Sequence, residues 1–453
     1  MTLNQDRAAV TLVEPKIDPS TRKLVVDVTA VSGQAFFTGV QRMVREFCET
    51  HQSDVLLVRF DAKFGVFRTI PRLGRLRYRS VEGWRGRLRL RLKKWYWNAS
   101  REFREQGTKR SWMPKFVRNA ARAFYERFLS DTELEKAKAL QRRPVWEPAP
   151  HQTFFLLDIP VSQAHISALI DLVATRVVRS VVYLHDLFPL SHKQLFDAKH
   201  HAGVRARHLR YLDLVTSVDE VVCNSAFTKS QYERFTSLIE DPIVQQVKVV
   251  YPPWPQFIER SDDSSEELTD VFGDADVRIV AVGALDRRKN LVVLVAALNE
   301  LVSRGINARL VLVSGATAQM DPNFRAEMLS LDDDVRERVI VLRQVSDNRL
   351  VEVYDAATVV AVPSLAEGFG LPVVEGLRRG KIVVAAHTTA LTELAETLPV
   401  RLVDPHDAPA WATAIAESSL VTSATPMDAP PAFPRDWSDF RTRLFGDSVE
   451  KGS

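Results

Sequence analysis

The sequence predicts an α/β protein made of two doubly wound parallel sheets that face each other across a cleft. Its runs of Val, Ile and Leu are nearly continuous rather than alternating, which is typical of parallel strands buried on both faces. Helical patterns such as residues 290–305 lie between successive runs. Residues 251–270, rich first in proline and then in acids and serines, divide the runs into two series.

Each series contains enough strand-like runs for a complete sheet. In the first series, the runs cover residues 23–31, 54–61, 153–159, 179–186, 220–226 and 247–253. In the second series, they cover residues 277–285, 308–316, 338–345, 358–365, 381–387 and 400–405. We therefore expect two Rossmann-like domains of similar size.

The chain of 453 residues is too long for one ordinary core, which also favours more than one domain. We expect an N-terminal domain over residues 1–252 that carries a basic insertion at about 62–150. Residues 253–430 form the expected second domain, and residues 431–453 a last helix that can return to the first domain.

Composition excludes several classes of protein. The chain is 45% apolar and 26% charged, which is ordinary for a soluble globular protein. Its two cysteines, Cys48 and Cys223, do not suit a secreted disulfide scaffold. The mixed, polar N-terminus and the lack of a long apolar run predict a cytoplasmic protein, soluble or attached to the inner membrane face.

A cationic turn opens the second series. After the strand at 277–285 come Arg287, Arg288 and Lys289, followed by Asn290, which can cap the next helix. Cations at the C-terminal edge of a parallel strand, beside a helix N-terminus, favour a bound anion such as phosphate. A solvated basic turn explains the same residues equally well.

Two carboxylates flank a glycine loop further along the second series. Gly368 and Gly370 let backbone N–H groups approach a ligand at a helix start, where a diphosphate would be favoured. Glu367 before the loop and Glu375 inside the helix can accept hydrogen bonds from hydroxyls on either side of it. A nucleotide sugar has this form. The alternative is that Glu367 is a turn residue and Glu375 a surface residue of a helix.

In the first series, Gly33 and Gly39 bracket a loop before a helix pattern. His185 and Asp186 end a strand, at the edge where ligands bind in such sheets. A single histidine is more often structural than catalytic, so both a structural and a functional role stay open for His185. No His or Cys spacing is typical of a zinc site.

Several motifs in this order resemble one enzyme family. They are "TGVQR", "VVYLHDLFPL", "CNSAFTK", "VVYPP", "GALDRRKN", "LVSG", "VSDNRLVEVYDAA", "PSLAEGFGLPVVEGLRRG" and "VDPHD". Together they resemble the retaining, nucleotide-sugar-dependent glycosyltransferases of GT-B fold in glycosyltransferase family 4. The resemblance covers about residues 25–61 and 150–420, and the "TGVQR" loop is most similar to bacterial mannosyl- and rhamnosyltransferases of surface polysaccharides.

The resemblance implies roles for matching residues of the second domain. Glu367 would contact the hydroxyls of the donor sugar as a catalytic residue, and Glu375 would hold the ribose. Arg288 and Lys289 would bind the diphosphate. Ala284 stands where many members have an arginine, which leaves the phosphate charge to these two cations.

The backbone of Phe369, Gly370 and Leu371 would lie beside the sugar and phosphates. Gly39 would face them from the first domain, and His185 would lie near the anomeric centre as a second catalytic residue. The implied reaction moves a hexose to a hydroxyl acceptor, saccharide or lipid-linked, and needs no cofactor or metal. A nucleotide-sugar epimerase, another GT-B enzyme or a non-catalytic scaffold are the alternatives.

Residues 68–122 carry 18 Lys or Arg against three acids and include half of the eight tryptophans. Cations interleaved with aromatic rings suit an anionic membrane surface. A solvated insertion packed on the first domain explains the segment equally well. No recognised nucleic-acid-binding module is present, so we expect no nucleic acid partner.

Overall fold

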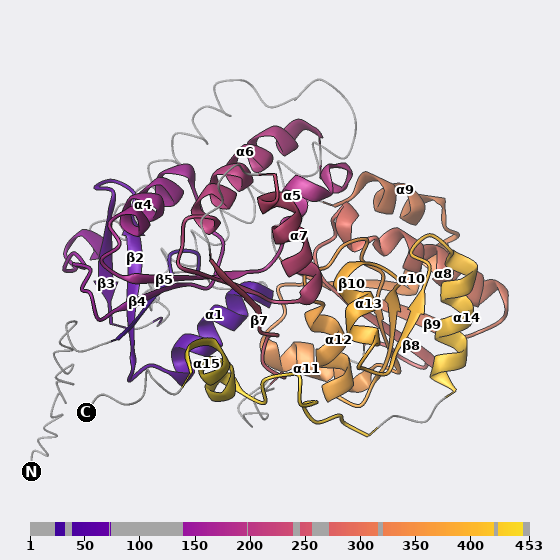
Figure 1. Ribbon diagram of the computed structural model, residues 1–453. Coiled ribbons are helices and arrows are strands. Elements are labelled where there is room, and N and C mark those ends of the chain that lie inside the picture. Colours follow the sequence, from indigo (N-terminus) through magenta and orange to yellow (C-terminus); the bar gives the residue numbers. More distant parts are fainter. Residues whose placement is uncertain are drawn as a thin grey trace, which may run out of the picture.

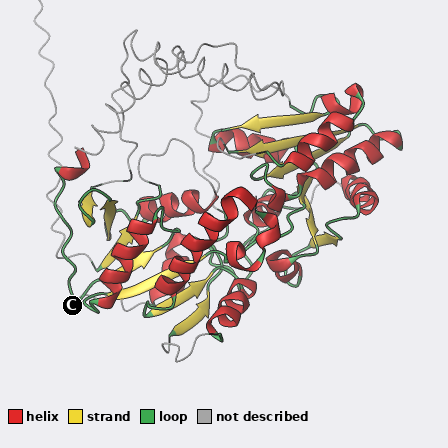
Figure 2. Cartoon of the chain, turned by 90° about the horizontal axis from the view of Figure 1, so that it is seen from above, coloured by secondary structure: helices red, strands yellow, loops and turns green. Residues whose placement is uncertain are grey.

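The computed structural model shows two α/β domains, with the first half of the chain in one and most of the second half in the other (Figure 1). A view turned by 90° shows that helices flank the strands of each sheet (Figure 2). The structure describes residues 23–31, 39–71, 73, 139–196, 198–238, 245–255, 271–315, 320–420 and 425–446.

The first domain contains a seven-stranded sheet in the order β3-β2-β1-β4-β5-β6-β7. All neighbours are parallel except β2 and β3, which are antiparallel. The strands are β1 (Leu24–Asp27), β2 (Val55–Asp61), β3 (Val66–Ile70), β4 (Thr153–Leu156), β5 (Arg179–Leu184), β6 (Glu220–Cys223) and β7 (Gln246–Val249).

The second domain contains a fully parallel six-stranded sheet in the order β10-β9-β8-β11-β12-β13. This is the strand order of a Rossmann fold, with the topological switch between β8 and β11. The strands are β8 (Val277–Val282), β9 (Ala308–Ser314), β10 (Val339–Arg343), β11 (Val359–Val362), β12 (Ile382–Ala386) and β13 (Val400–Val403).

Helices connect the strands within each domain. In the first domain they are α1 (Gly39–Thr50), α4 (Gln163–Ala174), α5 (Phe188–Ser191), α6 (Ala198–Val215) and α7 (Ala226–Thr236), with a 3₁₀ turn η2 (Lys193–Leu195). The second domain has the 3₁₀ turn η3 (Arg287–Lys289) and the helices α8 (Leu291–Ser303), α9 (Pro322–Ser330), α10 (Asp333–Glu337), α11 (Asp347–Ala356), α12 (Leu371–Arg378), α13 (Thr389–Ala395) and α14 (Ala408–Ser419).

The first sheet is buried on both faces, which explains its continuous apolar runs. Val25 of β1 belongs to one core together with Ile166 of α4. Its neighbours Leu24 and Val26 point to the other face and share a core with Phe47 of α1. The prediction of two doubly wound sheets is therefore confirmed.

One strand, β3, was not predicted from the sequence. Its residues "VFRTI" contain no continuous apolar run, because β3 is an antiparallel strand at the edge of the sheet and is buried only at Phe67. Arg68 of β3 donates from Nε to Asp61 Oδ2 over 2.8 Å and forms a bridge with Val145. Both ends of the expected basic insertion, 62–150, are thus part of the sheet edge. Apart from residues 68–71 and 73, the segment 68–122 lies outside the described residues.

The last helix, α15 (Trp437–Phe445), follows the second domain but packs on the first, beside α1 (Figure 1). Its Phe440 ring lies 5.4 Å from that of Tyr183, and its Phe445 ring lies 5.2 Å from that of Phe155. All four rings are buried in one core. The first domain is therefore completed by residues from the other end of the chain.

Candidate active site

The cationic turn after β8 places two charged side chains together. Asp286 accepts a hydrogen bond from the backbone N–H of Lys289 (3.1 Å) and so closes the turn η3. A Cβ on Gly283 would lie 2.9 Å from Cε of Lys289, so glycine is needed there to leave room for the lysine side chain. Arg287 of the same turn is exposed, whereas Arg288 and Lys289 extend toward β11.

Glu367 receives both of these cations. Lys289 Nζ forms an ion pair with Glu367 Oε1, and Arg288 donates to Glu367 Oε2 (3.2 Å) and to the carbonyl of Ala366 (3.0 Å). Ser364 Oγ donates to Glu367 Oε1 (2.7 Å). The carboxylate is buried, with its residue 7% exposed. It therefore provides the negative charge that the two cations need while no anionic ligand is bound.

The ionisation of Glu367 is governed by its burial and by its two cationic neighbours. Burial alone would raise the pKa of this carboxyl, but Lys289 and Arg288 outweigh it and lower the pKa to about 2. A group with a lowered pKa stabilises the fold above its unfolded pKa, 4.5 here, and loses that contribution as the pH falls.

We expect Glu367→Gln to be less stable than the parent at neutral pH, because Lys289 and Arg288 lose their counter-ion. The difference in free energy of unfolding should narrow as the pH is lowered from about 5.5 toward 3.5, since the parent carboxylate loses its advantage in that window. Urea denaturation at a series of pH values measures it. A difference that stays constant across the window contradicts this electrostatic account.

The glycine loop before α12 brings the two domains into contact. Gly370 is the residue before the first turn of α12 and has φ 110°, which favours glycine. A Cβ on Gly368 would lie only 2.0 Å from the carbonyl oxygen of His185. The carbonyl of Gly368 accepts hydrogen bonds from Ser225 Oγ (2.5 Å) and Thr228 Oγ1 (3.2 Å) of the first domain.

His185 follows β5 and is buried. Its Nε2 lies 2.7 Å from the carbonyl oxygen of Leu157, which can only accept, so Nε2 carries the proton. In the neutral ring Nδ1 then keeps its lone pair. This histidine lies directly against Gly368, next to the Glu367 cluster.

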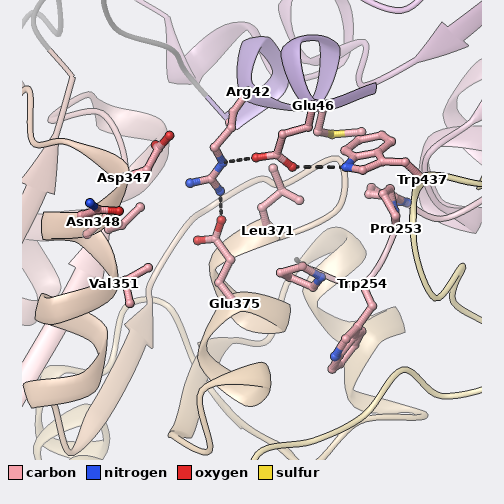
Figure 3. Close-up of a pocket in the computed structure, with 15 residues that line it drawn as sticks. Arg42, Glu46, Pro253, Trp254, Asp347, Asn348, Val351, Leu371, Glu375 and Trp437 are labelled. Carbon is pink, nitrogen blue, oxygen red and sulfur yellow. Dashed lines mark hydrogen bonds and ion pairs between the residues drawn. The ribbon is translucent and has the colours of Figure 1, made fainter. Parts of the chain in front are cut away.

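Glu375 lies inside α12, buried, at 2% exposure. Tyr354 of α11 donates to its Oε2 (2.7 Å), and Arg42 of α1 forms an ion pair with its Oε1 (Figure 3). Arg42 belongs to the first domain. The side chain that is expected to hold a ribose is therefore bonded to both domains.

A pocket lies between the domains beside Glu375 (Figure 3). Residues of α1, α11, α12, α15 and the interdomain connection line it: Gly39, Arg42, Met43, Glu46, Pro252, Pro253, Trp254, Pro255, Asp347, Asn348, Leu350, Val351, Leu371, Glu375 and Trp437. A Cβ on Gly39 would lie 2.9 Å from Leu371, so the two domains approach closely here. Neither His185, Lys289 nor Glu367 lines this pocket.

The predicted residues thus fall into two groups. One group contains His185, Arg288, Lys289, Glu367 and Gly368, and the other contains Gly39, Leu371 and Glu375. The backbone of residues 369 and 370 connects them. The side chain of Phe369 points elsewhere, since its ring lies 5.9 Å from that of Tyr251 at the interdomain connection.

Asn290 differs from the expectation that it caps α8. It occupies the residue before the helix, with φ 50° and no capping hydrogen bond from its side chain. Its amide instead donates to the carbonyls of Pro363 (3.1 Å) and Pro405 (2.7 Å). It therefore ties together the loops after β11 and β13, near the Glu367 cluster.

The sequence analysis did not single out Arg42, Tyr354 or Glu393. Glu393 of α13 accepts hydrogen bonds from the backbone N–H groups of Ala226 and Phe227, both 2.8 Å, and so caps α7 across the domain boundary. The sequence contained a signal for Arg42, because this residue ends the "TGVQR" motif and lies in a first helical turn that has no acidic residue. Tyr354 lies inside the "VSDNRLVEVYDAA" motif, whereas Glu393 lies outside the motifs that carry the resemblance.

In the described part of the chain, no three His, Cys, Asp or Glu side chains are grouped so that they could hold a metal ion. Within the same part, no helix has the length and apolar character needed to cross a bilayer.

Comparison with known proteins assigns the second domain. Residues 276–419 match the family model "Glycosyl transferases group 1". A D-inositol 3-phosphate glycosyltransferase of Xylanimonas cellulosilytica is 39% identical over 135 residues, 30% of this chain and 32% of that protein. The serotype-specific mannosyltransferase WbdA of Escherichia coli is 24% identical over 232 residues, 51% of this chain and 28% of that protein. The chain thus spans less than half the length of these relatives.

The similarity to solved structures covers both domains. Sucrose-phosphate synthase from Thermosynechococcus elongatus aligns with a TM-score of 0.55 over 93% of this chain and 94% of that one, at 18% identity. Anabaena Alr3699/HepE, solved in complex with UDP and glucose, aligns with a TM-score of 0.51 over 94% and 97%, at 15% identity. These alignments confirm the predicted GT-B fold. Residues 276–419 therefore form a glycosyltransferase group 1 domain within a two-domain GT-B fold.

Proposed function

We propose that this protein is a glycosyltransferase that moves a hexose from a nucleoside diphosphate donor to a hydroxyl acceptor, with retention at the anomeric carbon. The observation that carries the proposal is the cluster of Lys289 and Arg288 around the buried Glu367, beside the loop that opens α12. Two cations and a helix N-terminus are suited to the charge of a diphosphate. The group 1 domain match and the UDP complexes solved for Alr3699/HepE support a nucleotide-sugar donor.

In this proposal the diphosphate replaces Glu367 as the partner of Arg288 and Lys289. The two cations then stabilise the negative charge that develops on the leaving diphosphate. Glu367, no longer paired with these cations, accepts hydrogen bonds from sugar hydroxyls. The backbone carbonyl of His185, on the opposite domain, faces Gly368, and we propose that the imidazole of this residue orients the reacting groups. We propose a front-face substitution, in which the leaving group assists the acceptor.

The acceptor and the place of action are further parts of the proposal. We propose a saccharide or lipid-linked acceptor in the synthesis of a surface polysaccharide or glycolipid, supported by the similarity to WbdA, a serotype-specific mannosyltransferase. The cations and tryptophans of residues 68–122 support attachment to an anionic membrane surface from the cytoplasmic side. Co-sedimentation with acidic vesicles at low and high salt tests that attachment.

A thermal-shift screen with common nucleotide sugars, followed by transfer assays with the stabilising donor, tests the proposed activity. A ligand that binds the native state raises its unfolding temperature by mass action. Transfer with a retained anomeric configuration supports the proposal. Epimerised donor without transfer would show an epimerase, and binding without any turnover would show a non-catalytic scaffold.

We expect transfer to continue in excess EDTA. Arg288 and Lys289 already supply positive charge where the diphosphate is proposed to lie, so no divalent ion is needed to neutralise it. Initial rates measured with and without EDTA should agree within about twofold, since charge stabilisation by a lost ion would change them far more. Activity that disappears in EDTA and returns with manganese or magnesium would overturn this part of the proposal.

A further inference from the structure

Helix α1 extends two arginines across the boundary between the domains. Arg42 and Arg45 are one turn apart and share a helix face. Arg42 pairs with Glu375 of α12 (Figure 3). Arg45 Nη2 lies 2.8 Å from Asp347 Oδ2 at the start of α11. Both acidic partners belong to the second domain.

The two ion pairs differ in burial. The side chain of Asp347 is 46% exposed, whereas that of Glu375 is 3% exposed. An exposed pair contributes little, because water and salt screen it. A buried carboxylate that loses its counter-ion becomes strongly disfavoured and tends to take up a proton. Arg42 is therefore the more consequential of the two arginines.

The carboxylate of Glu375 still has unused acceptor positions. An ionised carboxylate offers about four such positions on its two oxygens. Tyr354 occupies one on Oε2 and Arg42 one on Oε1. The remaining positions suit two hydroxyls on neighbouring carbons, and Glu375 lines the interdomain pocket from which such a diol could approach.

Contacts with Glu46 and Trp437 position the side chain of Arg42. Glu46, one turn further along α1, lies 3.8 Å from Nε of Arg42 and accepts a hydrogen bond from Trp437 Nε1 of α15 (3.3 Å) (Figure 3). The chain of contacts from Trp437 through Glu46 to Arg42 directs the guanidinium toward Glu375. Such fixed orientation is what a carboxylate-positioning group requires.

We propose that Arg42 is a positioning residue for the ribose of the donor. From the first domain, it holds the Glu375 carboxylate in an orientation that accepts hydrogen bonds from the 2′- and 3′-hydroxyls. This inference rests on the proposed function. It also means that the ribose site is complete only while the two domains are together, so that nucleotide binding favours the closed arrangement.

The test measures the affinity of UDP, GDP and ADP, and of their 2′,3′-dideoxy counterparts, by titration calorimetry. We expect Arg42→Ala to weaken binding of the preferred ribonucleotide by about tenfold, the usual size for one charge-assisted contact. Binding of the dideoxy nucleotide should stay within about twofold, since it has no hydroxyls to offer Glu375. Arg42→Lys should recover part of the loss because it keeps the charge but not the planar fork.

The matched control is Arg45→Ala, which breaks the pair with Asp347 between the same two domains and does not contact Glu375, although Arg45 also lies 3.7 Å from Oε1 of Glu46. It should leave both affinities within about twofold. In a Glu375→Gln background, Arg42→Ala should cause no further loss, which also tests the proposal if the single arginine variant proves poorly folded.

Three results would overturn the inference. The first is that Arg42→Ala leaves both affinities unchanged, as Arg45→Ala is expected to do. The second is that Arg42→Ala weakens the binding of ribonucleotides and dideoxynucleotides equally, since that would indicate a general structural role. Independent, additive losses from Arg42→Ala and Glu375→Gln would also exclude it. If the parent protein binds none of the three nucleotides, the proposed function itself fails. If it binds one and Arg42→Ala changes nothing, only the inference fails.

Discussion

Lys289→Ala is expected to lower kcat by roughly 10²–10³-fold, the size of effect seen when one preorganised charge contact to the transition state is removed. Lys289 and Arg288 are the cations that face Glu367, and the proposed diphosphate would take the place of that carboxylate. The fold should persist, because Glu367 keeps Arg288 and Ser364 as partners. Steady-state transfer assays and thermal unfolding measure the two effects.

The matched control for this prediction is Arg287→Ala. Arg287 lies in the same turn and carries the same charge as Lys289, but its side chain is exposed. Removing it should change kcat by less than about twofold, because an exposed charge is well screened. Near-normal turnover of folded Lys289→Ala, or an equal loss in both variants, contradicts the assignment of Lys289.

Gly368→Ala is expected to lower transfer on the order of 10²-fold, because displacing reacting groups by about 1 Å can have that effect. A Cβ at this position would lie 2.0 Å from the carbonyl oxygen of His185, and backbone cannot yield as a flexible side chain does. The glycine loop must then move away from β5. That movement also weakens the hydrogen bonds from Ser225 and Thr228 to the carbonyl of residue 368.

The control is Gly203→Ala in α6, where a Cβ would meet no atom within 4 Å. This change should leave transfer unaltered and stabilise the helix slightly, since alanine is the better helix former. Transfer and thermal unfolding, measured on both variants, separate a local clash from a general effect of the added methyl group. If Gly368→Ala keeps full activity, the domains do not need this close approach.

The strands could be predicted from the sequence where burial on both faces leaves a continuous apolar run. This holds for the second sheet, whose β8 and β11 are flanked by other strands and covered by helices. It fails for β3, which lies at the edge and runs antiparallel. Edge strands have less need of apolar residues, so their sequence carries a weaker signal.

The site could be predicted only as far as local motifs reach. The cationic turn and the glycine loop were recognisable because each lies within one short stretch. Their mutual contact was not, because Lys289 and Glu367 are 78 residues apart and only the neighbouring positions of β8 and β11 bring them together. The Arg42–Glu375 pair was harder still, since it depends on how two domains meet.

The return of α15 to the first domain affects how the protein can be made. A ribosome releases the N-terminal domain first, and domains generally fold in that order. Here Trp437, Phe440 and Phe445 belong to the core that covers one face of the first sheet. Helix α1 covers part of this face, but the part under α15 stays uncovered until α15 has been made, after the second domain. The first domain therefore exposes part of its apolar core while the second domain is being made, and such exposed surface makes a folding intermediate prone to aggregation.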